Sequence, residues 1–138
     1  MNPQLNMEIR EALDNGLDYI NRVHKNLGLL TDALERKDEK SITSNYNDLK
    51  EGLEWLFDIL RSIGALLQLN YSEILISKQS VDKIINNYMK LLTQIDELHN
   101  KDEYAEVSII VKDELPKHLK KITSIFNKIN TIMNGKEN

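Results

Sequence analysis

The sequence contains no cysteine, and that absence excludes several kinds of chemistry at once. Disulfide bonds, cysteine-ligated zinc, thiol nucleophiles and thiol redox switches all require this residue. A chain without disulfides suits a reducing compartment. We therefore expect a cytoplasmic protein that folds around an ordinary apolar core, because 138 residues are enough to bury one.

Proline, glycine and long apolar runs are also scarce. The chain has 2 Pro and 5 Gly against 20 Leu and 16 Ile, too few turn residues for the many tight connections of an all-β fold. No stretch reaches the roughly 18 consecutive apolar residues that a membrane span needs. The first residues lack the basic and apolar regions of a signal peptide. We expect an all-α protein with no membrane partner.

Charge gives a further exclusion. The 18 basic and 22 acidic side chains leave a net charge of −4, which is the wrong sign for a generic nucleic-acid binder. The excess acid lies in the first half, since residues 1–69 hold 8 basic and 12 acidic side chains and residues 70–138 hold 10 of each. We expect no nucleic-acid partner.

Apolar residues recur in steps of three and four along almost the whole chain, which is the spacing of amphipathic helices. The pattern predicts helices over residues of about 3–35, 39–68, 78–99 and 103–133. Four long amphipathic helices with two short connections and one longer connection most simply form an up-down-up-down four-helix bundle. We expect a single domain over residues 1–138.

Single residues indicate where the helices start and where one is interrupted. Suitable N-caps are Asn2, Asp38, Ser77 or Ser80, and Asn100 or Asp102. Pro116 lies inside the apolar period of the last helix, where it removes one backbone donor and crowds the preceding turn. We expect a kink at Pro116, and the alternative is two helices that meet at Leu115.

Three polar residues fall at one level of the predicted core. At 100° per residue His24, His99 and His118 all lie near the centre of the apolar stripe of their helices, so we expect them to point inward. His24 and His118 come to similar heights in the bundle, and so does Tyr88. The sequence therefore predicts a polar core layer of His24, Tyr88 and His118.

This polar layer has two interpretations. The histidines either form hydrogen bonds that fix the helix register, or they hold a metal ion or a small ligand. Bundle di-metal centres use inward carboxylates, typically in Glu-x-x-His pairs, and the chain contains no Glu-x-x-His. We expect the structural role, with no metal and no cofactor, and we regard a small-molecule ligand as unlikely.

The segment His24-Lys25-Asn26-Leu27-Gly28 has a histidine followed four residues later by a glycine. It resembles the phosphoacceptor segment of histidine-phosphotransfer domains, which are also four-helix bundles. In those domains the glycine clears space for the phosphoryl group, and a lysine stands where this chain has Leu27. The acceptor must be exposed, whereas the stripe places His24 inward, so phosphotransfer is a minor alternative.

Motifs for catalysis are missing. The sequence has no glycine-rich phosphate loop and no Gly-x-Ser-x-Gly nucleophile motif. We expect no catalytic residues.

The helix predicted over residues 39–68 has more apolar residues than one core-facing stripe requires. Trp55, Ile59 and Leu66 recur at steps of four and seven along its flank, and Trp55 is turned about 135° from the centre of the stripe. One interpretation places Ile59 and Leu66 at the edge of the core and Trp55 along the surface. The other makes all three an apolar interaction surface for a second copy or another helix.

Glycines inside predicted helices are the last unusual feature. Gly16, Gly28, Gly52 and Gly64 each cost up to about 1 kcal/mol relative to alanine in a helix interior. We expect close approach of a neighbouring segment to compensate for this cost.

Two stretches also carry a family resemblance. Gly52-Leu53-Glu54-Trp55-Leu56-Phe57, and the stretch from Asp102-Glu103-Tyr104 to Asp113-Glu114-Leu115-Pro116, resemble small all-helical proteins of unknown function in low-GC Gram-positive bacteria. The resemblance covers about Ala12 to Ile132. It departs at Ser108, where such sequences more often have an acidic residue, and at Lys112, where they more often have an acidic or aromatic one. It implies an all-helical fold and no particular activity.

These observations together predict a non-catalytic interaction protein. We expect it to self-associate as a homodimer through Trp55, Ile59 and Leu66, or to act as a small adaptor or chaperone for a helical protein partner. The alternative is a ligand- or metal-binding bundle, and then an enzyme is conceivable, centred on His24, Tyr88 and His118.

Overall fold

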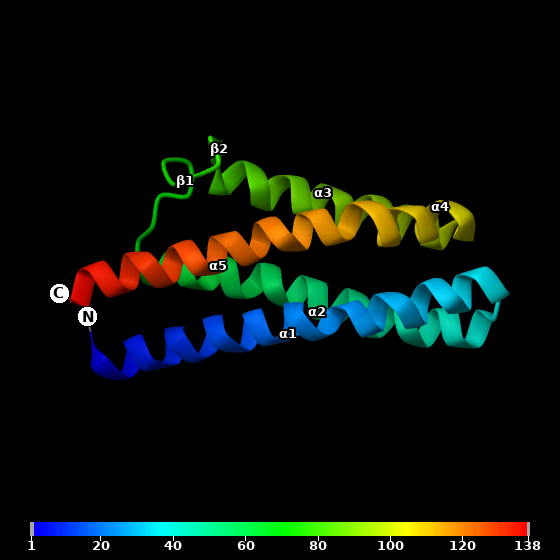
Figure 1. The fold of residues 1–138 in the computed structure, drawn as a ribbon, viewed down its shortest axis with the longest axis horizontal. Helices are drawn as coiled ribbons and strands as arrows, with labels where there is room; N and C mark the ends of the chain where they lie inside the picture. Colours follow the sequence, from blue (N-terminus) through cyan, green and yellow to red (C-terminus); the bar gives the residue numbers. More distant parts are fainter. Residues whose placement is uncertain (1, 138) are drawn as a thin grey trace.

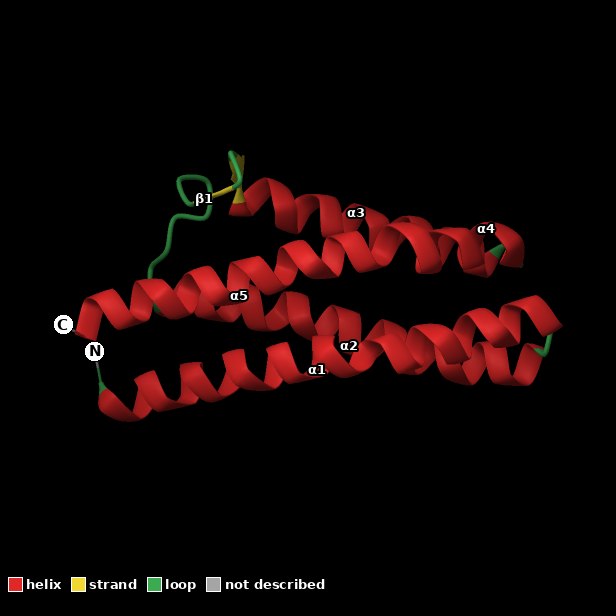
Figure 2. Ribbon diagram, in the orientation of Figure 1, coloured by secondary structure: helices red, strands yellow, loops and turns green. Residues whose placement is uncertain are grey.

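The computed structural model describes residues 2–137, and most of them are helical (Figures 1 and 2). The elements in chain order are α1 (Pro3–Arg36), α2 (Glu39–Leu66), β1 (Leu75–Ile76), β2 (Gln79–Ser80), α3 (Val81–Asn100), α4 (Tyr104–Ile109), the π-helix η1 (Ile110–Glu114) and α5 (Leu115–Glu137). The expected all-α character is confirmed. The two strands form a small antiparallel hairpin beside the helices.

The long helices lie side by side and successive ones run in opposite directions (Figure 1). Helix α1 contacts α2, α4 and α5, while α3 contacts α4, α5 and, more sparsely, α2. Buried residues from all of these helices form one apolar cluster along their length. Helix α1 begins and α5 ends at the same end of the molecule.

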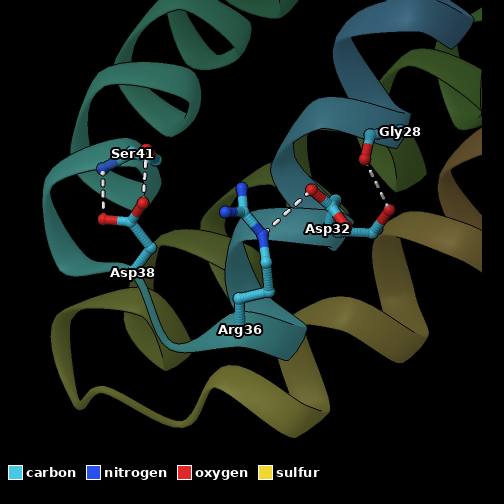
Figure 3. Close-up of polar contacts among 6 residues, drawn as sticks. Gly28, Asp32, Arg36, Asp38 and Ser41 are labelled. Carbon is cyan, nitrogen blue, oxygen red and sulfur yellow. Dashed lines mark hydrogen bonds and ion pairs between the residues drawn. The ribbon is translucent and has the colours of Figure 1, made fainter.

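The helix starts follow from local capping chemistry. Asn2 Oδ1 accepts a hydrogen bond from the backbone N–H two residues on at 2.8 Å, and Ser80 Oγ accepts one from three residues on at 3.2 Å. Asp38 caps α2, accepting bonds from the backbone N–H and the hydroxyl of Ser41 at 3.4 and 2.9 Å (Figure 3). These bonds lower the pKa of the Asp38 carboxyl. The caps expected at these three positions are confirmed.

The corner between α1 and α2 contains a second local interaction. Arg36 in the last turn of α1 pairs with Asp32 at 3.1 Å (Figure 3). Lys37 follows in a left-handed conformation with φ of 55° and ends the helix. Since both charged side chains of the pair are well exposed, the capping geometry matters more to this corner than the ion pair does.

The last predicted cap is wrong. The N-cap of α4 is Glu103, without a side-chain capping bond, rather than Asn100 or Asp102. Asp102 has φ of 57°, because the chain needs a left-handed residue to reverse direction between α3 and α4. Neither candidate is therefore available to cap the next helix.

The connection between α2 and α3 is more ordered than a plain loop. Ser77 and Lys78 have φ of 49° and 70°, the left-handed pair that closes a two-residue hairpin. Strand β1 pairs with β2 in the register Leu75 to Ser80. This hairpin extends to Ser80, so α3 starts at Val81 instead of near residue 78.

The chain remains helical through Pro116. Residues 104–137 are helical throughout, and the turn before the proline is a π-helix, Ile110–Glu114, in which the Leu115 N–H donates to the carbonyl of Ile110. Leu115 itself has helical φ and ψ of −58° and −43°. A π turn thus lies directly before Pro116, where we expected a kink, and the backbone stays helical across Leu115, so the alternative of two separate helices is wrong.

Candidate functional site

Tyr88 of the predicted polar layer lies in the centre of the molecule. Its side chain is fully buried, and its hydroxyl donates to the carbonyl oxygen of Leu53 at 2.7 Å. Burial raises the pKa of Tyr88. The hydroxyl thus ties α3 to α2, and this polar group is satisfied by backbone rather than by a histidine.

Of the two histidines, His24 does not join Tyr88 in the core. His24 is exposed, and His118 is half-buried with a pKa lowered by burial and then by the nearby charge of Lys121. The expectation that His24 points inward is wrong. Its neighbour Val23 is fully buried. The angle of the apolar stripe was averaged over a long helix at 100° per residue, and at this position the buried face is turned away from that average. His24 therefore lies outside the buried face.

The exposure of His24 bears on the phosphoacceptor resemblance. A Cβ on Gly28, one turn further along α1, would meet no atom within 4 Å. The histidine is therefore accessible, which removes one objection to phosphotransfer. Leu27 still stands where phosphotransfer domains have a lysine. The expectation that a neighbouring segment lies against Gly28 is wrong.

His99 belongs to a polar cluster that sequence reasoning missed. Its ring stacks on that of Tyr46 with centroids 3.8 Å apart, and the Tyr46 hydroxyl donates to Asp96 at 2.6 Å. Lys50 reaches the same carboxylate oxygen at 3.0 Å. These two bonds lower the pKa of Asp96, while burial lowers that of His99. A tyrosine on the apolar stripe of α2 was the available signal, because its hydroxyl needs a partner.

A cavity of about 140 Å³ lies between α2 and α3 beside this cluster, and we call it the α2–α3 cavity. Its apolar lining is Leu49, Leu53, Met89, Leu92 and Ile95, and its polar lining is Tyr46, Lys50, Glu54, Thr93 and Asp96. Since Tyr46, Lys50 and Asp96 already bond to one another, most of its polar groups are satisfied within the protein.

The predicted interaction surface lines a second hollow, which lies between α1 and α2. The apolar residues of this Trp55 groove are Leu5, Ile9 and Ala12 from α1 and Trp55, Ile59 and Leu66 from α2, with Ile63 at its base. Its volume is about 290 Å³. Thus the structure brings the three predicted residues to one surface and adds α1 residues that sequence reasoning did not assign to it.

The three predicted residues differ in exposure. Trp55 is 39% exposed and Leu66 is 52% exposed, as an outward position on α2 predicts. Ile59 is only 8% exposed, because it packs into the core below the groove. Ile59 is therefore an edge-of-core residue that forms the floor, and Trp55 and Leu66 are the residues available to a partner.

Trp55 is held in place by an aromatic contact to α1. Its ring meets that of Tyr19 edge to face, with centroids 5.8 Å apart. Tyr19 lies against α2 at Gly52, where a Cβ would overlap its ring and hydroxyl. Gly16 receives Phe126 in the same way, so close approach compensates for both glycines. Burial raises the pKa of Tyr19.

Membrane spans and metal clusters are two further features considered for residues 2–137. No helix in this range combines the length and the apolar character needed to cross a membrane. Within the same residues, no three side chains of His, Asp or Glu come together in a way that could hold a metal ion.

Comparison with known proteins adds no relative. The chain matches no protein family, no curated protein and no solved structure. The resemblance to small helical proteins of low-GC Gram-positive bacteria accordingly stays a prediction, and function must be argued from the geometry.

Proposed function

We propose that the chain is a non-catalytic interaction protein of the cytoplasm, an up-down-up-down four-helix bundle that receives a helical protein partner in the Trp55 groove. An adaptor or a small chaperone would use a surface of this kind. The observation that carries the proposal is a partly exposed tryptophan, the chain's only one, beside a well exposed leucine at the edge of an apolar hollow.

The form of the groove supports a helix as its occupant. Leu5, Ile9 and Ala12 recur along one face of α1, and Trp55, Ile59 and Leu66 recur along the facing flank of α2. The α2 residues span 11 positions, or roughly 16 Å of helix. An amphipathic helix of about three turns would therefore place its apolar ridge along the hollow, as in helix-in-groove recognition.

A designed peptide tests the groove. The probe is an 18-residue helical peptide with a leucine ridge, glutamine flanks and no aromatic residue. Its binding to the full chain is followed by calorimetric titration and by the fluorescence of Trp55. We expect binding that moves the Trp55 emission to shorter wavelength, since the peptide would cover a ring that is now partly exposed.

Matched surface variants locate the binding. Leu66→Ser removes an exposed groove residue and should weaken the peptide by about tenfold, or about 1.4 kcal/mol. Ile109→Ser removes a residue that is 59% exposed outside the groove, and should leave the affinity unchanged. Equal affinities for both variants, or no binding by the parent chain, would reject the groove as a docking site.

A ligand-binding function is the second candidate, and the α2–α3 cavity supports it better than the His24, Tyr88 and His118 layer does. A cavity of about 140 Å³ with a mixed apolar and polar lining has the size that holds one ring bearing a hydroxyl group. Titration with benzyl alcohol, observed by the NMR signals of Met89, tests it. Filling the space with Leu92→Phe should abolish any such shift without unfolding the chain; unchanged methyl signals in the parent would remove this candidate.

A further inference from the structure

The Trp55 groove is bordered by carboxylates. From its charge pattern we infer that its partner is a helix with lysine and arginine flanks, and not a second copy of this chain. The inference rests on the proposed function and specifies the chemistry of the partner. Glu8 of α1 and Asp58 of α2 are the charged side chains that line the groove within the described residues.

The acidic border continues past Trp55. An adjoining hollow on α2 shares Trp55 and Asp58 with the groove and is otherwise lined by Gly52 and by Asp48, Glu51 and Glu54. All three of these carboxylates are exposed. No lysine or arginine among the described residues lines either hollow, although Arg61 reaches Asp58 at 3.5 Å from outside.

The spacing of the carboxylates matches the side of a docked helix. Asp48, Glu51, Glu54 and Asp58 follow one another along α2 at steps of three and four, so they share one face beside Trp55. The row is about 15 Å long and overlaps the groove at Asp58, so a helix in the groove would have to continue past Trp55 to lie beside all four carboxylates. A partner with an apolar ridge and basic residues at the same steps would satisfy both surfaces together.

The same charges oppose a symmetric dimer through this groove. In a two-fold interface whose axis passes through the acidic row, Glu51, Glu54 and Asp58 of one copy would face carboxylates of the other. Like charges brought together in this way disfavour association. The inference therefore favours a basic partner over the expected homodimer, which stays a prediction.

The charge of the whole chain points the same way. Residues 1–69, which include both groove helices, hold 8 basic and 12 acidic side chains, whereas residues 70–138 hold 10 of each. All of the net negative charge thus belongs to the half that forms the groove, and it would draw a basic segment toward that side.

Two further peptides test the inference. They keep the leucine ridge and replace the glutamine flanks by lysine in one and by glutamate in the other. At about 0.1 M salt we expect the lysine peptide to bind the full chain at least about tenfold more tightly than the glutamate peptide. At about 1 M salt the difference should largely disappear, because exposed charges are then screened within about 3 Å.

Variants place the effect at the groove. Glu51→Gln with Glu54→Gln should weaken the lysine peptide severalfold and leave the glutamine peptide unaffected. The matched control, Glu106→Gln with Glu114→Gln, changes two exposed carboxylates of the α4 to η1 segment and should alter neither affinity.

Each outcome separates the inference from the proposed function. Equal binding of the lysine and glutamate peptides, with both weakened by Leu66→Ser, would overturn the inference of a basic partner. The groove would then still stand as the proposed docking site. A dimer of the chain alone in sedimentation equilibrium, dissociated by Leu66→Ser, would overturn the inference as well. Failure of all three peptides to bind would reject the proposed function itself.

Discussion

On the side of α2 that faces α1, Gly52 lets the ring of Tyr19 lie directly against the helix, and Trp55 packs on that ring. On the side that faces α3, the two helices leave the α2–α3 cavity between them and are joined by polar bonds, from Tyr88 to Leu53 and from Tyr46 and Lys50 to Asp96. The α1–α2 contact therefore depends on close packing of side chains, whereas the α2–α3 contact depends on hydrogen bonds.

The difference between the two sides shows where a partner surface can arise. Toward α3, Tyr46 and Lys50 bond to Asp96 and Tyr88 bonds to Leu53, while His99 Nδ1 is buried without a hydrogen-bond partner among the described residues. Toward α1 the aromatic packing ends in an apolar edge, Trp55 and Leu66, which stays partly exposed. Surplus apolar area at Trp55 and Leu66 therefore marks the candidate site.

The largest expected effect breaks the close packing on the α1 side. Gly52→Ala places a methyl group where the ring and hydroxyl of Tyr19 lie, so Tyr19 must move away from α2 and Trp55. We expect the free energy of unfolding to fall by about 1–3 kcal/mol. Urea denaturation measures it.

The same substitution in a Tyr19→Ala variant tests whether Tyr19 causes this loss of stability. With Tyr19→Ala already present the clash is gone, and Gly52→Ala should then stabilise the chain by up to about 1 kcal/mol because alanine favours a helix. If Gly52→Ala destabilises both backgrounds equally, Tyr19 is not the reason for the glycine.

The next effect concerns the hydrogen bond on the α3 side. Tyr88→Phe removes a buried hydroxyl at 2.7 Å from the Leu53 carbonyl and should cost about 1 kcal/mol. Tyr104→Phe is the control, because its hydroxyl bonds to Asp102 at an exposed site and should contribute little. Equal costs in thermal denaturation would contradict the view that burial gives the Tyr88 bond its value.

The smallest effect is a change in pH dependence on the α3 side. Burial holds the pKa of His99 below its ordinary value of 6.5 in the folded chain. As the pH falls below about 6.5 the unfolded state takes up the proton first, so stability decreases. His99→Phe keeps a ring against Tyr46 and removes this proton uptake.

Denaturation midpoints between about pH 8 and pH 5 measure the slope. The variant should lose less stability on acidification than the parent, and His118, whose pKa is also lowered, should account for part of the remaining slope. An unchanged slope would show that the ring of His99 is equally easy to protonate in both states.

Much of the fold could be predicted because its signals are local. Helix periods and the caps Asn2, Asp38 and Ser80 depend on neighbours within one turn, which the sequence contains directly. The hairpin after α2 was missed since neither residue of its left-handed pair, Ser77 and Lys78, is a glycine, asparagine or aspartate.

The candidate site was predicted in part. An outward Trp55 follows from helix angles alone, but the α1 side of the groove depends on how two helices come together. The polar layer failed for a related reason: His24 lies next to a buried valine, and a small error in the phase of a 34-residue helix carries it to the surface. The contacts of Tyr46 and Asp96 depend on register between α2 and α3.

The π turn before Pro116 explains a detail of the spacing in the last helix. Val107, Val111, Leu115 and Leu119 are four apart and all buried. In a regular α-helix each step of four overshoots one revolution by about 40°, and three steps would carry the last side chain about a third of the way round. The π turn has more residues per turn than an α-helix and cancels much of that rotation. A series of buried residues spaced four apart therefore indicates in the sequence where the helix changes its number of residues per turn.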